Sequence, residues 1–405
     1  MNDASHSKIS MSSPDLTDAE RRAVLDVLNT PSLSMGAQIQ AFEQAIRDFA
    51  GTKHAIAVSS GTAGLHLCVR AAGIGPGDLV LTTPFSFVAS TNVLLFENAV
   101  PVFIDVDPRS GNLDPVQAAS AARDLAAGGK KAERWLPRRG VARAKHASPQ
   151  QASRLRALLP VDVFGQPADW DALRQIAGEF GLKVIEDSCE ALGAEYRGRK
   201  AGTFGDYGVF AFYPNKQITT GEGGIVVTDD ETAAGLMRAL RNQGRAPGDT
   251  WLQHTHLGYN YRLDEMSAAL GAVQMLRLEE LLRKREQVAA WYGERLAEIP
   301  GVQAPTVEPA TTRVSWFVYV VRFDTRIDRD ALAGRLEGRG IPVRPYFLPI
   351  HLQPYMVERF GYREDDFPVT EDLGRRGLAL PFSSVMGEGQ VEAVCRAIRE
   401  EVQRQ

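Results

Sequence analysis

The chain has 405 residues, 44% of them hydrophobic and 24% charged, a composition that predicts one large buried core with a smaller one and argues against disorder. Its formal charge of −4 gives no reason to expect a nucleic-acid partner, and no apolar run is long enough to span a membrane. The N-terminus lacks the apolar core of a signal peptide and the three cysteines form no CxxC pair, so we expect a cytoplasmic protein without a disulfide framework or a metal site.

Short apolar segments alternate with helical ones, which predicts an α/β fold whose mostly parallel strands are buried on both faces. The predicted strands cover residues 54–59, 79–83, 101–105, 159–163, 182–186, 207–212 and 224–228. Helical spacing predicts a long helix over residues 264–299, ended by Pro300 and Gly301. A strand in SWFVYVVRF and helices in IDRDALAGRLEGRG and VEAVCRAIREEVQ follow. We therefore expect a large domain over residues 1–265, and a linking helix with a small α+β domain over 266–405.

Residues 130–156 depart from this alternation. They hold nine Lys or Arg residues against the single acid Glu133, and we interpret about residues 128–156 as an exposed basic insertion. The simpler interpretation is a solvated loop without a role in the chemistry. The alternative is that its positive field attracts an anionic substrate that carries a diphosphate.

Asp187 and Lys216 are the strongest chemical signal in the chain. Asp187 ends the apolar run of residues 182–186, and Lys216 lies on a glycine-rich loop after a predicted strand. Pyridoxal 5′-phosphate (PLP) needs a lysine amine that binds its aldehyde and then acts as a base, and a fixed carboxylate facing its pyridine nitrogen. Alone, either residue is ordinarily a solvated lysine or a helix cap. Together they indicate a PLP site.

Two neighbouring segments suit the rest of that cofactor. Ser60, Gly61, Thr62 and Ala63 lie between a predicted strand and a predicted helix, where backbone N–H groups and the helix dipole bind phosphate. This pattern is common, and its position upstream of Asp187 and Lys216 gives it weight. In the segment PFSF, Phe85 or Phe87 could stack on the ring, and both could equally be core residues.

Several longer segments resemble the DegT/DnrJ/EryC1/StrS family of sugar aminotransferases, among them FEQAIRDFAGTKHAIAVSSGTAGLHL, VIEDSCEALGAEYRGRKAGTFGDYGVFAFYPNKQITTGEGG and LGYNYRLDEMSAALGAVQMLRLEELLRKR. The resemblance covers nearly the whole chain. It implies the aspartate aminotransferase-like fold (PLP fold type I), with a seven-stranded, mostly parallel sheet and a smaller α+β domain.

The resemblance also implies roles for single residues. Lys216 would bind the cofactor aldehyde and Asp187 the pyridine nitrogen. Gly61, Thr62 and Ala63 would form the phosphate loop, and Phe87, not Phe85, would stack on the ring. Asn260 would reach the phosphate of the neighbouring subunit, with Arg262 as a further contact there or to substrate. The active sites would therefore be shared in a homodimer.

Two positions depart from the family pattern. Ala211 lies five residues before Lys216, where relatives often have a serine that binds the phosphate. Glu190 lies three residues after Asp187, where relatives often have Gln or His, and a carboxylate there resembles the branch that aminates C4 of nucleotide-linked 4-keto-6-deoxy sugars. The alternative for Glu190 is an acid on the side of a helix without contact to the site.

Tyr346 and His351, in RPYFLPIHLQPYM, lie where the small domain of such proteins closes over the sugar. They are expected either as substrate contacts or, equally, as satisfied surface or core groups.

The implied reaction moves an amino group from glutamate to a nucleotide-linked keto sugar, most concretely C4 of an NDP-4-keto-6-deoxyhexose, with Lys216 as the proton carrier. A dehydratase of the same family would carry histidine in place of Lys216. The remaining alternatives are C3 amination, a ketocyclitol acceptor, or a non-catalytic regulatory protein on the same fold. The residues leave the nucleotide, the sugar and the amino donor open.

Overall fold

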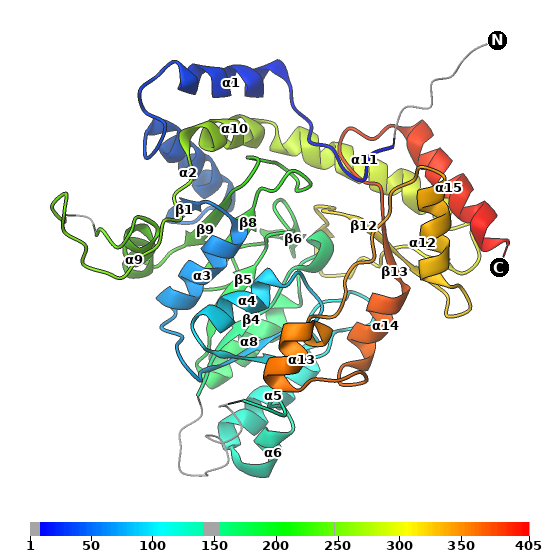
Figure 1. Cartoon of the computed structure of the whole chain (residues 1–405), viewed down its shortest axis with the longest axis horizontal. Helices are drawn as coiled ribbons and strands as arrows, with labels where there is room; N and C mark the ends of the chain where they lie inside the picture. Colours follow the sequence, from blue (N-terminus) through cyan, green and yellow to red (C-terminus); the bar gives the residue numbers. More distant parts are fainter. Residues whose placement is uncertain (1–8, 141–153, 247, 405) are drawn as a thin grey trace.

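The computed structural model describes residues 9–140, 154–246 and 248–404, and a seven-stranded sheet lies at its centre (Figure 1). The strands, in spatial order, are β1 (His54–Val58), β9 (Gly224–Thr228), β8 (Tyr207–Ala211), β5 (Lys183–Asp187), β4 (Leu155–Leu159), β2 (Leu79–Thr82) and β3 (Val100–Phe103). β9 runs antiparallel to both of its neighbours, and the other pairs are parallel. The expected sheet is confirmed.

Alternate residues along the strands pack into opposite layers, as the period of two in a strand requires. In β1, Ile56 and Val58 join one hydrophobic cluster, whereas Ala55 and Ala57 join another. The first layer holds α3 (Gly61–Ala71), α4 (Ala89–Phe96) and α9 (Glu231–Arg241). The opposite layer holds α2 (Ala37–Ala50), α5 (Pro115–Ala127) and α8 (Trp170–Phe180). Burial on both faces explains why the central strands are apolar throughout.

The predicted strand over residues 159–163 is wrong by four residues, because β4 ends at Leu159. Pro160 has no N–H to continue the ladder, and only an isolated bridge between Val161 and Asp187 follows. Residues Val163–Gly165 form a 3₁₀ turn in which Phe164 has a left-handed backbone with φ of 59°. The shift matters because Phe164 then lies in a loop at the carboxyl ends of the strands.

A second, antiparallel sheet is built from β10 (Val302–Gln303), β12 (Tyr319–Phe323) and β13 (Gly377–Leu380). It shares a hydrophobic cluster with α11 (Leu278–Leu296), α12 (Arg329–Gly338) and α15 (Glu388–Val402). The long helix predicted over residues 264–299 is in fact two, α10 (Glu265–Leu276) and α11, separated by Arg277 with φ of −103° and ψ of 1°.

Near both ends of the chain, some residues pack against one sheet although the residues next to them in sequence belong with the other. Phe347, Ile350, Phe360 and Leu373 pack into clusters of the large sheet, although they follow the small sheet's β12 in sequence. Ile9 packs against the cluster of the small sheet. The division at residue 265 stays a prediction.

The described part of the basic insertion is tied to acids elsewhere. α6 (Gly129–Glu133) begins it, and then Arg134 binds Asp124 at 2.6 Å while Arg138 binds Asp366. Arg154 and Arg156 both face Asp78, at 3.0 and 3.7 Å. Arg143 and Lys145 lie outside the described residues. These pairs engage four of the nine basic residues with three acids, and the role of the insertion's charge stays a prediction.

Within the described ranges, no helix combines the length and the apolar character needed to cross a lipid bilayer.

Candidate active site

Asp187 ends β5 at the carboxyl edge of the parallel strands, where ligands of open α/β sheets bind. Its side chain is buried, at 3% exposure. Oδ2 accepts a hydrogen bond from the Ser90 hydroxyl at 2.6 Å, and Oδ1 accepts one from the backbone N–H of Cys189 at 3.2 Å. Ser90 lies on α4, so two separate segments fix the direction of this carboxylate.

Two further buried acids anchor the strand end behind Asp187. Glu186 accepts backbone N–H groups of residues 202, 204 and 205. Asp162 accepts the Ser188 hydroxyl at 2.6 Å and the Trp170 indole N–H at 3.1 Å. Burial raises the pKa of Asp162 to about 6, and burial together with the nearby Asp162 raises the pKa of Glu186 well above its usual range. These contacts hold the turn after β5 rigidly.

Lys216 lies on the loop after β8, which turns back so that the Lys216 N–H donates to the Tyr213 carbonyl at 2.9 Å. Its Nζ lies 3.7 Å from Oε1 of Glu190 and 3.6 Å from the centre of the Phe317 ring. The side chain is 13% exposed. The amine therefore lies between a carboxylate and an aromatic face and is still reachable from outside the protein.

Arg285, on α11, fixes this loop from behind. Its guanidinium donates to the carbonyls of Lys216 at 2.5 Å and Asn215 at 3.3 Å, and to those of Trp316 at 3.0 Å and Phe317 at 3.3 Å. The side chain is fully buried, and burial lowers its pKa to about 10. One arginine therefore joins the loop that carries Lys216 to the segment that places Phe317 over it.

Glu190 lies in a turn and faces the lysine. Its Oε2 accepts the backbone N–H of Phe164 at 2.9 Å, and its own carbonyl accepts the Gln217 amide at 2.6 Å. Burial raises the pKa of Glu190, and the nearby Lys216 partly offsets this. The interpretation of Glu190 as a helix-side acid remote from the site does not fit these contacts.

The N-terminus of α3 lies against Ala211, the last residue of β8, and Cys189, in the turn after β5. Ser60 caps the helix and accepts the Ala63 N–H at 3.1 Å, which leaves the N–H groups of Gly61 and Thr62 without a partner in the helix. A Cβ on Gly61 would lie 2.7 Å from Cβ of Ala211 and 2.9 Å from Sγ of Cys189. Gly61 therefore packs closely against Ala211 and Cys189, and the N–H groups of Gly61 and Thr62 at this helix N-terminus fit an anionic group such as a phosphate. The Ala63 N–H is already used by the cap.

The structure separates the two candidate stacking aromatics. Phe85 is 2% exposed and packs edge-on against Phe164 and Phe347, as a core residue does. Phe87 is 62% exposed and lies three residues before Ser90, the partner of Asp187. Phe87 is therefore the aromatic that is free to contact a ligand.

The remaining predicted residues fall in three different environments. Asn260 is exposed, and Arg262 donates to the Asn242 side chain at 3.1 Å. Tyr346 stacks on Phe164, with ring centres 6.3 Å apart, which places it near Glu190.

His351 is fully buried. Its Nε2 lies 3.0 Å from Glu371 and its ring packs on Phe367. These contacts favour the core interpretation of His351 over a substrate contact.

Sequence reasoning missed four residues that the fold brings to this place: Ser90, Phe164, Arg285 and Phe317. Ser90 lies in the segment PFSFVAS, whose resemblance to the family was the one available signal. Phe317 lies in the predicted strand SWFVYVVRF, and Arg285 lies in the helix predicted over residues 264–299. All four approach Lys216, Asp187 or Glu190 only through tertiary packing.

An aspartate at the end of β5, a lysine on the loop after β8 and a helix N-terminus at the ends of the same two strands define the class of PLP-dependent aminotransferases of fold type I. Residues 14–399 match the DegT/DnrJ/EryC1/StrS aminotransferase family. The chain belongs to this family of sugar aminotransferases, and PLP is the cofactor expected from family and fold.

Named relatives cover nearly the full length. The chain is 36% identical to a GDP-perosamine synthase of Caulobacter vibrioides, over 96% of this chain and 97% of that protein. It is 33% identical to a dTDP-3-amino-3,4,6-trideoxy-alpha-D-glucose transaminase of Streptomyces venezuelae, over 96% and 92%. The crystal structure of DesV from S. venezuelae superposes with a TM-score of 0.84 at 32% identity and covers 98% of this chain and 99% of that one.

Proposed function

We propose that the protein transfers an amino group from glutamate to C4 of a nucleotide-linked 4-keto-6-deoxy sugar. The observation that carries the proposal is the position of the Lys216 amine, 3.7 Å from Glu190 and on the same sheet edge as Asp187. The full-length likeness to a GDP-perosamine synthase makes a GDP-linked keto sugar the first acceptor to test.

PLP would be held by four groups of this chain. Lys216 would bind its aldehyde, Asp187 would face its pyridine nitrogen, Gly61 and Thr62 would bind its phosphate, and Phe87 would cover its ring. When bound, the cofactor would supply an electron sink for the carbon that bears the amino group. Because the Ser90 hydroxyl and the Cys189 N–H both donate to Asp187, its carboxylate is oriented for that contact.

The amine of Lys216 would do the proton transfer. Nζ would take a proton from the α-carbon of glutamate and, in the second half of the reaction, return one to the sugar carbon that receives nitrogen. Glu190 lies close enough to orient this amine, and Phe317 keeps water from one side of it. The nucleotide would contribute binding energy remote from the reacting carbon.

A homodimer would complete each site. Asn260 is exposed on its own subunit, and exposed apolar residues in the same loop region suit a subunit contact: Trp251, Leu252 and Leu257. Asn260 and Arg262 would then reach the phosphate in the partner's site. Gel filtration or light scattering tests this, and full activity in a monomer would contradict it.

Amination at C3 is the second candidate, because a relative of similar identity is a 3-amino sugar transaminase. A ketocyclitol acceptor would use the same cofactor residues. A regulatory protein without catalysis would lack the reaction with glutamate.

The deciding experiment is to incubate the purified protein with PLP and glutamate and then to offer GDP-, dTDP- and UDP-linked 4-keto and 3-keto sugars. We expect a yellow protein that glutamate bleaches, 2-oxoglutarate as a product, and an amino sugar whose position NMR assigns. Lys216→Arg keeps the charge and should abolish turnover. A protein that glutamate does not bleach would refute catalysis, and a product aminated at C3 would select the second candidate.

A further inference from the structure

The N-terminal segment of the described chain lies across the joint between α10 and α11. α1 (Asp18–Leu28) runs along α10 (Figure 1). Before it, the N–H of Phe382 donates to the Met11 carbonyl at 2.9 Å, beside the small sheet. Residues 9–17 therefore connect the small sheet to α10.

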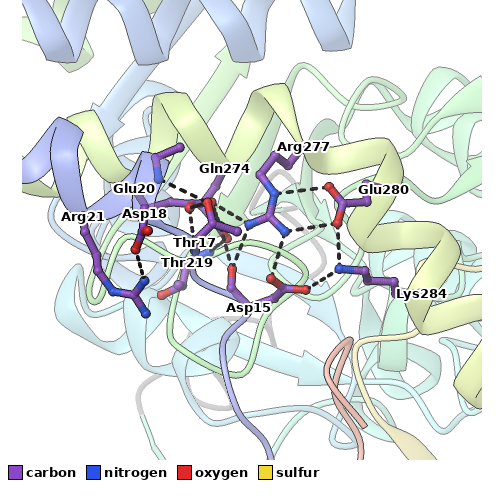
Figure 2. A network of polar contacts seen from close by, with 11 residues as sticks. Asp15, Thr17, Asp18, Glu20, Arg21, Thr219, Gln274, Arg277, Glu280 and Lys284 are labelled. Atoms are coloured by element: carbon purple, nitrogen blue, oxygen red, sulfur yellow. Dashed lines mark hydrogen bonds and ion pairs between the residues drawn. The ribbon is translucent and has the colours of Figure 1, made fainter. Parts of the chain in front are cut away.

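A network of charged side chains fixes this segment (Figure 2). Arg277, the residue between α10 and α11, binds Asp15 at 2.8 Å and Glu20 at 2.7 Å. Lys284 binds Asp15 at 2.8 Å and Glu280 at 2.6 Å. Glu20 is 1% exposed although it is charged, which makes it the buried centre of the network.

Gln274 joins this network to the loop of Lys216. Its amide nitrogen donates to Glu20 Oε1 at 2.7 Å and to the Asp15 carbonyl at 3.0 Å, while its Oε1 accepts the N–H of Thr219 at 3.3 Å (Figure 2). Two acceptors on one side and a donor on the other determine the orientation of the amide. Gln274 is 1% exposed, so each of these bonds is shielded from water.

The loop itself depends on Thr219. The Thr219 hydroxyl donates to the Phe212 carbonyl at 3.0 Å and accepts the N–H of Gly221 at 2.9 Å. One turn before Gln274 on α10, a Cβ on Gly271 would lie 2.7 Å from Cγ2 of Thr220. One face of α10 thus packs directly against Thr219 and Thr220, which follow Lys216 by three and four residues in the loop.

We propose that Gln274, held by Glu20, is a positioning residue that keeps the loop after β8 in the conformation that presents the Lys216 amine. The inference rests on the proposed function, because it takes Lys216 as the reacting lysine. In a protein that lacks the Gln274 contact, the loop opens more often and the amine is less well placed for proton transfer. Binding of either substrate depends on other residues and changes little.

The test is hydrogen exchange of the cofactor-free protein, read by mass spectrometry on peptides that cover residues 213–223. Gln274→Met keeps the length of the side chain and removes its three hydrogen bonds. We expect about tenfold faster exchange in these peptides and no change in those that cover β5. Glu280→Gln is the matched control, since it alters the exposed rim of the same network without touching Gln274.

Kinetics of the PLP-loaded variant should show a lower kcat with KM for both substrates within about twofold. Unchanged exchange over residues 213–223, an equal rise in Glu280→Gln, or a uniform rise across the protein would overturn the positioning role. Where Gln274→Met does not fold, Glu20→Gln weakens the same support. Borohydride reduction of the wild type with PLP tests the proposed function separately: absence of cofactor on Lys216 refutes that function, whatever the exchange shows.

Discussion

Ser90 and Thr91 offer a test of how Asp187 is held. Both carry buried hydroxyls and are adjacent in sequence, but only the Ser90 hydroxyl bonds to Asp187. Ser90 Oγ donates to Asp187 at 2.6 Å, whereas Thr91 Oγ1 is buried and has no hydrogen-bond partner among the described residues. A hydrogen bond to a buried charged group contributes about 1.5–3 kcal/mol. Among the described residues, Ser90→Ala leaves the Asp187 carboxylate with hydrogen bonds from Cys189 alone, from its N–H at 3.2 Å and from its thiol. We expect it to lower the free energy of unfolding by about 1.5–3 kcal/mol.

Thr91→Val keeps the shape of the side chain and removes an unpaired hydroxyl, so we expect it to be neutral or slightly stabilising. Urea denaturation of both variants without PLP measures the difference. Titration with PLP adds a second readout. Because the Asp187 carboxylate is less well oriented in Ser90→Ala, the free energy of PLP binding should weaken by ~1.4 kcal/mol, which raises the Kd about tenfold. The Kd of Thr91→Val should stay unchanged. A loss in Ser90→Ala no larger than that in Thr91→Val would refute this account of Asp187.

Three further outcomes are expected. Arg285→Met should lower the free energy of unfolding by about 3–5 kcal/mol in urea, because four backbone carbonyls lose the donor that a fully buried side chain supplies; a loss below about 1 kcal/mol would contradict this role of Arg285. For Glu20, burial alone would raise the pKa, but hydrogen bonds from Thr17, Arg277 and Gln274 outweigh it and lower the pKa from 4.5 to about 2. A pKa that is lower in the folded than in the unfolded state stabilises the fold above pH 4.5, and this stabilisation is lost as the pH falls toward 2. Glu20→Gln should therefore lower the free energy of unfolding by about 3 kcal/mol at pH 7 and by less than half of that at pH 3. A difference between the two proteins that does not depend on pH would exclude this linkage. Gly61→Ala should weaken PLP binding at least tenfold, as measured by absorbance titration, since its Cβ would lie 2.7 Å from Ala211; the double variant with Ala211→Gly should recover part of the affinity, and no recovery would argue against this contact.

The sequence alone indicated the fold class and the pair Asp187 and Lys216 as a PLP site. Apolar runs broken by glycine and turn residues located six of the seven strands, and the signal for Asp187 and Lys216 was local, because each follows such a run. The strand at β4 was misplaced, since the apolar residues continue past Pro160 and the missing N–H of proline, rather than hydrophobicity, ends the ladder.

The tertiary structure decided which side chains surround that pair. Ser90 reaches Asp187 across 97 residues of chain, and Arg285 reaches the carbonyl of Lys216 across 69. Tertiary packing also buries His351 in the core and leaves Phe87 exposed, and the residue types alone did not determine either environment. Hydrophobic periodicity and turn preferences act over about a dozen residues, so they specify strands, helices and the ends of strands. Contacts between distant segments follow from how whole layers pack, and no local pattern in the chain carries that information.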